Sequence, residues 1–97
     1  MGIQDYQSQI LSIFKKKFIE EEAGDSKELA NVIRQRLMLI EDSEDRKNLV
    51  NNVLDEIHEI SLIQKYKNLY SSNGTHNITN IPLNLVEYLT HSFRRVS

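Results

Sequence analysis

The sequence predicts an all-α fold: a small single-domain helical bundle of four to five helices spanning residues 1–97. Three observations lead to this prediction. The 97 residues include only three Gly and one Pro, which are too few turn-forming residues for a β fold with many turns. Apolar residues recur every three or four positions along most of the chain, as they do in amphipathic helices. They are mainly aliphatic, with eleven Ile, eleven Leu and five Val, and so can build one modest core.

The first helix is expected from Ile3 to about Glu22, with Gly24 just after it as a glycine cap. Lys15–Lys17 precede Glu20–Glu22, and at i,i+4 spacing that order of charges is the weaker one. We therefore interpret these runs as a solvated face rather than a contact for anionic lipid or an acidic partner. The apolar stripe of this helix consists of Ile3, Tyr6, Ile10, Ile13, Phe14 and Phe18.

The second helix is expected to begin at Asp25 or Ser26 and to run to about Glu41. Glu28 stands three residues after Asp25, as the acid of a capping box does. A corner at Glu41–Asp45 should follow, because its acids suit the start of the next helix. The glycine and final glutamate of a calcium-binding loop are absent there. The apolar stripe consists of Leu29, Val32, Ile33, Leu37 and Ile40.

Three residues of the second helix do not follow its stripe. Met38 and Leu39 lie off it, and Arg36 lies beside the column formed by Val32 and Ile40. The favoured interpretation of Arg36 is an aliphatic stem on apolar surface with its charged head pointing outward. The alternative is a guanidinium paired with a carboxylate of another helix or of a partner.

The third helix should start near Ser43, and its apolar pattern changes sides. With Leu49 at 0°, the apolar residues up to Ile60 lie between about 0° and 140° at 100° per residue. Leu62 and the apolar residues after it lie between about 200° and 320° on the same wheel. Either one continuous helix serves two opposite surfaces, or the helix is broken or bent near Ser61. We favour the break, because Ser61–Gln64 has the form of a capping box.

The segment Tyr70–Pro82 is the only long stretch without a helical pattern, and a short hairpin could occupy 69–79. Asn73 and Gly74 are typical of a tight hairpin turn, so a short hairpin and a polar loop are both compatible with it, and the loop is favoured. The last helix should begin around Pro82, whose fixed φ suits a first turn. Its apolar stripe consists of Leu85, Val86, Leu89, Phe93 and Val96.

The sequence gives no indication of catalysis, of a metal site or of a cofactor. There is no Cys, which removes thiol chemistry and cysteine-ligated metals. His58-Glu59 begins like a zinc-binding H-E-x-x-H motif, but Leu62 stands in place of the second His. The glycine-rich motifs that bind phosphates or dinucleotides are also absent. We expect a non-enzymatic protein.

Charge and hydropathy narrow the choice of partners. The formal net charge is −2, which argues against strong non-specific binding of nucleic acid. No apolar run approaches the length of a membrane span, and a basic start followed by an apolar signal segment is missing. We therefore expect a cytoplasmic protein without a membrane span.

Two functional hypotheses remain. The first is a small regulatory or inhibitory protein, of adaptor, inhibitor or immunity type, that binds a protein partner or a second copy of itself through helices. The second is a winged helix-turn-helix DNA-binding regulator that uses a short helix after the break and a hairpin wing. The interface residues of the first are Arg36, Met38, Leu39, Leu62 and Leu83, and the DNA-binding residues of the second are Gln64, Lys65, Lys67, Asn68 and Asn73.

Overall fold

The computed structural model describes residues 2–21, 23–70 and 84–93, and for 65–70 the backbone alone. The described residues form four α-helices and one π-helical segment and include no strand. This confirms the all-α prediction. The elements are α1 (Ile3–Phe14), the π-helix η1 (Lys15–Glu20), α2 (Ser26–Leu37), α3 (Ser43–Tyr70) and α4 (Leu85–Phe93).

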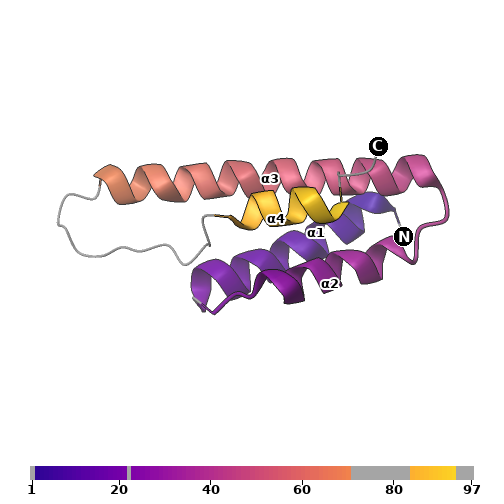
Figure 1. Cartoon of the computed structure of the whole chain (residues 1–97), viewed down its shortest axis with the longest axis horizontal. Coiled ribbons are helices and arrows are strands. Elements are labelled where there is room, and N and C mark those ends of the chain that lie inside the picture. Colours follow the sequence, from indigo (N-terminus) through magenta and orange to yellow (C-terminus); the bar gives the residue numbers. More distant parts are fainter. Residues whose placement is uncertain (1, 22, 71–83, 94–97) are drawn as a thin grey trace.

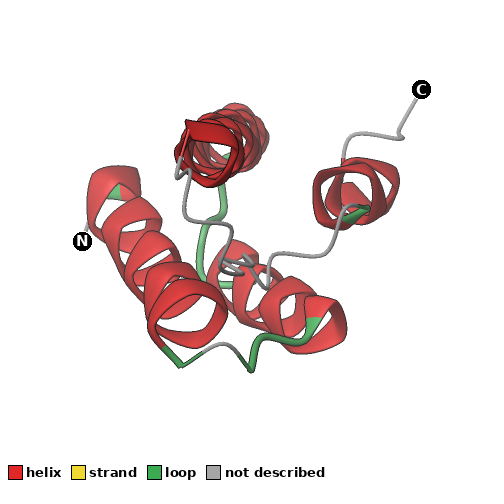
Figure 2. Ribbon diagram, turned by 90° about the vertical axis from the view of Figure 1, so that its left-hand side faces the viewer, coloured by secondary structure: helices red, strands yellow, loops and turns green. Residues whose placement is uncertain are grey.

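The helices pack as an up-down-up-down bundle (Figure 1). Successive helices run in opposite directions, as short connections favour for α1–η1 to α2 and for α2 to α3. Seen end-on, α3 lies between α1 and α4, and α2 completes the ring between α4 and α1 (Figure 2). Every helix therefore has a neighbour on each side and turns one apolar stripe inward.

The core is made by those stripes, largely as the spacing predicts. It is a single cluster with no buried polar or charged residue among the described ones. The rings of Phe14 and Phe18 lie 5.3 Å apart between centroids, in the tilted arrangement that aromatic pairs prefer. The cluster consists of Ile10, Phe14, Phe18, Leu29, Ala30, Ile33, Ile40, Leu49, Val50, Val53, Leu54, Ile57, Leu85 and Leu89.

The expectation of an α-helix from Ile3 to Glu22 is wrong in its last part. After Phe14 the helix widens to the π form, in which Glu21 N–H donates to the carbonyl of Lys16 at 2.8 Å. A π turn holds more residues than an α turn. Phe18, four positions after Phe14, lies beside it in the core. The apolar spacing contains no signal that separates this geometry from an ordinary helix.

Gly24 follows η1, but for a different reason than a left-handed cap. Its backbone does not lie in the left-handed region, and a Cβ at this position would overlap the ring of Phe18. The position thus requires the absence of a side chain, because the buried Phe18 ring lies directly against the backbone. Asp25 then caps α2, since its Oδ1 accepts the N–H of Lys27 at 3.0 Å.

Helix α2 ends at Leu37, earlier than the predicted Glu41. Met38 and Leu39 form a turn, while Ile40 returns to the core. Arg46 holds this corner: its Nε donates to the carbonyl of Ile40 at 2.8 Å, and its Nη2 to that of Glu41 at 3.0 Å. These carbonyls would otherwise lack helical partners.

Asp42 starts the third helix. Its Oδ1 accepts the N–H of Glu44 at 2.8 Å, which is an N-cap contact. The expectation that the acids of the corner begin the next helix is therefore confirmed.

The predicted break near Ser61 is wrong, because α3 continues without interruption from Ser43 to Tyr70. Instead of capping a new helix, Ser61 donates its Oγ–H to the carbonyl of Ile57 at 2.8 Å, one turn back in the same helix. Residues 58–64 contain neither Gly nor Pro, so nothing in the backbone forces a break. The continuous helix leaves Leu62 and Ile63 outside the core.

Other expectations concern the end of the chain. Leu69 and Tyr70 are helical, so a hairpin does not begin at 69, and the rest of the 69–79 segment lies outside the described residues. Within them α4 begins at Leu85, so the predicted start at Pro82 and the last stripe residue Val96 also lie outside.

Candidate partner-binding surface

Helix α3 is much longer than the helices it packs against. At about 1.5 Å per residue, its 28 residues span about 42 Å, against about 18 Å for the 12 residues of α2. Its C-terminal part, orange in Figure 1, extends beyond the other described helices.

Two neighbouring aliphatic residues in the C-terminal half of α3 are exposed. Leu62 is 42% exposed and Ile63 48% exposed, whereas Ile57, fewer than two turns earlier, is 0% exposed. Leu62 is thus exposed as its position off the stripe predicts. Isolated exposed aliphatics are ordinary, but two adjacent ones form a small apolar surface that the described residues cover only in part.

The side of α3 opposite the core is a continuous exposed face. The buried residues recur at helical spacing on one side of the helix, and exposed residues recur on the opposite side, as a continuous helix with one inward side requires. We call the exposed side the outer face of α3; its residues are Asn52, Asp55, Glu56, Glu59, Leu62 and Ile63. It is acidic over its first turns and aliphatic thereafter.

A second apolar site lies at the other end of α3. Met38 is 80% exposed and Leu39 is 65% exposed, in the turn between α2 and α3. Their positions off the apolar stripe of the second helix predicted this exposure. Ile40 is buried in the core, and the two side chains before it, Met38 and Leu39, point away from the core.

Arg36 does not contribute an exposed anchor. It is half-buried, and its Nε donates to Oε1 of Gln9 on α1 at 3.3 Å. The hydrogen bond joins α1 to α2 within the bundle. The guanidinium of Arg36 thus contacts another helix, as the alternative interpretation predicted. Its acceptor is the amide oxygen of Gln9, however, and not a carboxylate.

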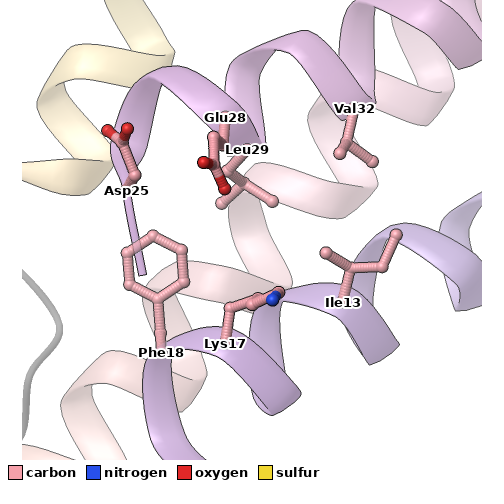
Figure 3. A pocket seen from close by; sticks show the side chains of 7 residues that line it. All are labelled: Ile13, Lys17, Phe18, Asp25, Glu28, Leu29 and Val32. Atoms are coloured by element: carbon pink, nitrogen blue, oxygen red, sulfur yellow. The ribbon is translucent and has the colours of Figure 1, made fainter. Parts of the chain in front are cut away.

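A groove lies between the α1–η1 segment and α2 (Figure 3). Its volume is about 110 Å³, room for a single side chain or a few water molecules. Buried Phe18 and Leu29 line its base, and the carboxylates of Asp25 and Glu28 lie at its edge. Ile13, Lys17 and Val32 complete the lining.

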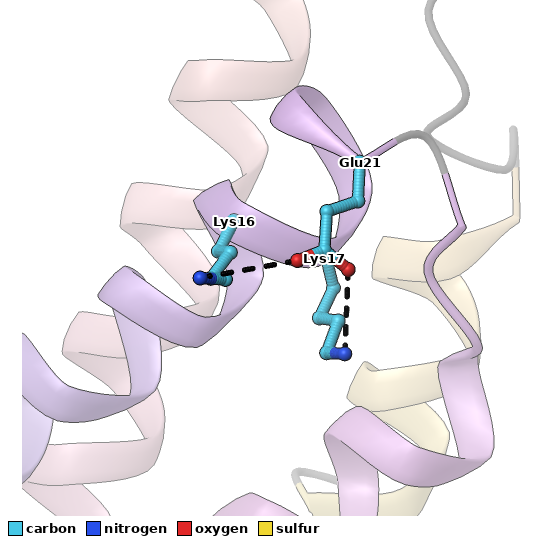
Figure 4. Close-up of polar contacts among 3 residues, drawn as sticks. All are labelled: Lys16, Lys17 and Glu21. Atoms are coloured by element: carbon cyan, nitrogen blue, oxygen red, sulfur yellow. Dashed lines mark hydrogen bonds and ion pairs between the residues drawn. The ribbon is translucent and has the colours of Figure 1, made fainter.

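The lysines of η1 are exposed, as the interpretation of a solvated face predicts, and two of them share one acid. Glu21 lies 3.4 Å from Nζ of Lys17 and 3.9 Å from Nζ of Lys16 (Figure 4). Ion pairs this exposed contribute little to stability. They do lower the local positive charge, so η1 presents no concentrated basic patch.

The helical residues of the DNA-binding alternative do not lie on a separate short helix after a break, but within α3. Gln64 is half-buried within α3, and the helix has no corner before Leu62. For Lys65, Lys67 and Asn68 only the helical backbone is described, and Asn73 lies outside the described residues. Leu83 of the interface set lies outside them as well.

Two exclusions concern the described part of the chain. No group of three or more His, Cys, Asp or Glu side chains gathers there in a way that would hold a metal ion. Among the same residues, no helix combines the length and apolar character needed to cross a membrane.

Sequence patterns alone did not single out Ile63, Glu56 and Glu59 as candidate partner-binding residues. Ile63 was identified as part of the second apolar set, and its position next to Leu62 was the available signal. Glu56 and Glu59 have no distinguishing pattern in the sequence. They share a face with Leu62 only because α3 is continuous.

Comparisons with protein-family models, with curated proteins and with solved structures found no match to this chain.

Proposed function

We propose that this is a small non-enzymatic regulatory or inhibitory protein, of adaptor, inhibitor or immunity type, that binds a protein partner through a helix face. One observation carries the proposal: Leu62 and Ile63 are exposed side by side on α3, the helix whose C-terminal part extends beyond the other described helices. Covering such residues is favourable by about 25 cal/mol for each Å² of apolar surface removed from water. The continuous helix α3 holds both side chains on one surface for that contact.

The corner with Met38 and Leu39 supports the proposal as a second contact point. Their exposed fractions are larger than those of Leu62 and Ile63, and the first turns of α3 follow directly. A partner that spans both points would lie along α3. The winged helix-turn-helix alternative is not favoured by any described feature, since it needs a corner where α3 is continuous.

Site-specific photo-crosslinking in cells that naturally express the protein tests this proposal. A benzophenone amino acid at position 62 should yield a crosslinked protein adduct of defined mass. The matched control is position 35, an exposed Gln on α2 that belongs to neither apolar site. If positions 62, 63, 38 and 39 all fail to crosslink, or crosslink no more than position 35 does, the proposal is wrong.

A further inference from the structure

We infer that the partner presents a basic amphipathic helix, which lies along the outer face of α3. This inference rests on the proposed function and adds the chemistry of the partner. It follows from the order of charges and aliphatic side chains on that face.

The outer face carries acids and no basic residue. Glu56 and Glu59 are exposed there, and the sequence contains no Lys or Arg between Lys47 and Lys65. Lys65 and Lys67 follow only after the aliphatic pair. A face of this charge attracts a positively charged partner and disfavours an acidic one.

The aliphatic pair lies on the same face, directly after the acids. Leu62 is about one turn beyond Glu59, and Ile63 is about two turns beyond Glu56. A helix that lies along α3 therefore meets carboxylates over two turns and aliphatics over the next. Its complement carries apolar residues at helical spacing and Lys or Arg along the same side.

A second copy of this chain fits the face less well. An antiparallel pair centred on Leu62 and Ile63 would place Glu59 opposite position 66 and Glu56 opposite position 69, where the sequence has Tyr and Leu. Burying a carboxylate against an apolar residue is unfavourable. A parallel pair would place each Glu opposite its own copy, and like charges repel. Both arrangements oppose self-association through this face.

Binding of a defined peptide to the full chain tests the inference. The probe is a fluorescein-labelled helical peptide of about 15 residues, or four turns, made of leucine and lysine in an amphipathic pattern. Its counterpart has glutamate in place of every lysine. Anisotropy should show binding of the lysine peptide alone, weakening as NaCl is raised from about 0.05 to 0.5 M.

Paired variants locate the binding. Glu56→Lys with Glu59→Lys should weaken binding about tenfold or more, since two attractions become repulsions. Glu20→Lys with Glu41→Lys changes net charge equally at exposed positions off the outer face, and should change affinity less than about twofold. Leu62→Ser should also weaken binding about tenfold. Circular dichroism of each variant verifies that the fold is retained.

Three outcomes would overturn the inference: equal binding of both peptides, equal loss in the two charge-reversal variants, or a dimer in light scattering that Leu62→Ser dissociates. The last would make a second copy the occupant. A protein crosslinked at position 62, together with a lysine peptide whose binding does not respond to Glu56 and Glu59, would refute the basic helix and leave the proposed function standing.

Discussion

Gly24 lies directly against the ring of Phe18, so close that a methyl group at position 24 would overlap the ring atoms. Phe18 is 1% exposed and cannot swing outward without leaving the core. We expect Gly24→Ala to lower the free energy of unfolding by about 1–3 kcal/mol, as overpacking typically does. Urea denaturation followed by circular dichroism measures the change.

Gly2→Ala is the matched control for that substitution, because a Cβ at position 2 meets no atom within 4 Å. It should leave the urea midpoint almost unchanged. Equal midpoints for the two variants would show that the ring of Phe18 does not press on the backbone at position 24.

Arg46 is expected to stabilise the corner between α2 and α3. Its side chain donates to the carbonyls of Ile40 and Glu41, and removing these hydrogen bonds should cost about 1–2 kcal/mol. Arg46→Ala should therefore lower the urea midpoint, and Arg46→Lys should restore only part of the loss, because lysine lacks the planar fork. Lys47→Ala, at an exposed neighbour, is the control, and a loss as large as that of Arg46→Ala would contradict this role.

Ile57 and Leu62 lie on the same helix but should respond differently to truncation. Ile57 is 0% exposed and Leu62 is 42% exposed. Ile57→Ala should cost about 2–5 kcal/mol through the cavity it leaves, and Leu62→Ala less than about 1 kcal/mol. Thermal unfolding of the two variants provides the measurement. Similar losses would mean that Leu62 is covered in solution by the rest of the chain or by a second copy.

The guanidinium of Arg34 on α2 lies over the ring of Phe93 on α4, 5.6 Å from its centroid. A cation–π contact at an exposed site contributes about 0.5–1 kcal/mol. Arg34→Gln should therefore speed hydrogen exchange of the α4 amides about two- to fivefold, if they exchange by detachment of that helix.

Asn31→Ala controls for the neighbouring hydrogen bond. Nη1 of Arg34 donates to Oδ1 of Asn31 at 2.8 Å, and this variant removes that acceptor while keeping the cation. Exchange of α4 should then stay near the original rate. Unchanged exchange in Arg34→Gln itself would show that the ring contact does not hold α4.

The apolar stripes predicted most of the core correctly. Ile10, Phe14, Leu29, Ile33 and Leu85 all lie where their spacing puts them, because a helical period of 3.6 residues fixes which side chains share a face. Caps were also predictable: Asp25 caps α2 through its own carboxylate, a contact made within a few residues. Such local patterns need no knowledge of the neighbouring helices.

The error at Ser61 shows where local patterns fail. The apolar residues directly after Ile60 do lie outside the core, as the change of side predicts. The break that we inferred from this change is absent. Whether a helix breaks depends on what else is available to cover its second face, and Ser61–Gln64 satisfies helix and cap patterns equally. The exposure of Leu62 was nevertheless predicted, since both interpretations place it off the first stripe.

By itself, the sequence determined the all-α class, the inward stripes and the exposed positions of Met38, Leu39 and Leu62, because periodicity and capping act over one or two turns. The tertiary structure alone decided that η1 widens to place Phe18 over Gly24, that Arg36 binds Gln9 and that α3 outruns its neighbours. These features depend on contacts between segments far apart in the chain, and no short-range pattern encodes the distance at which two helices meet.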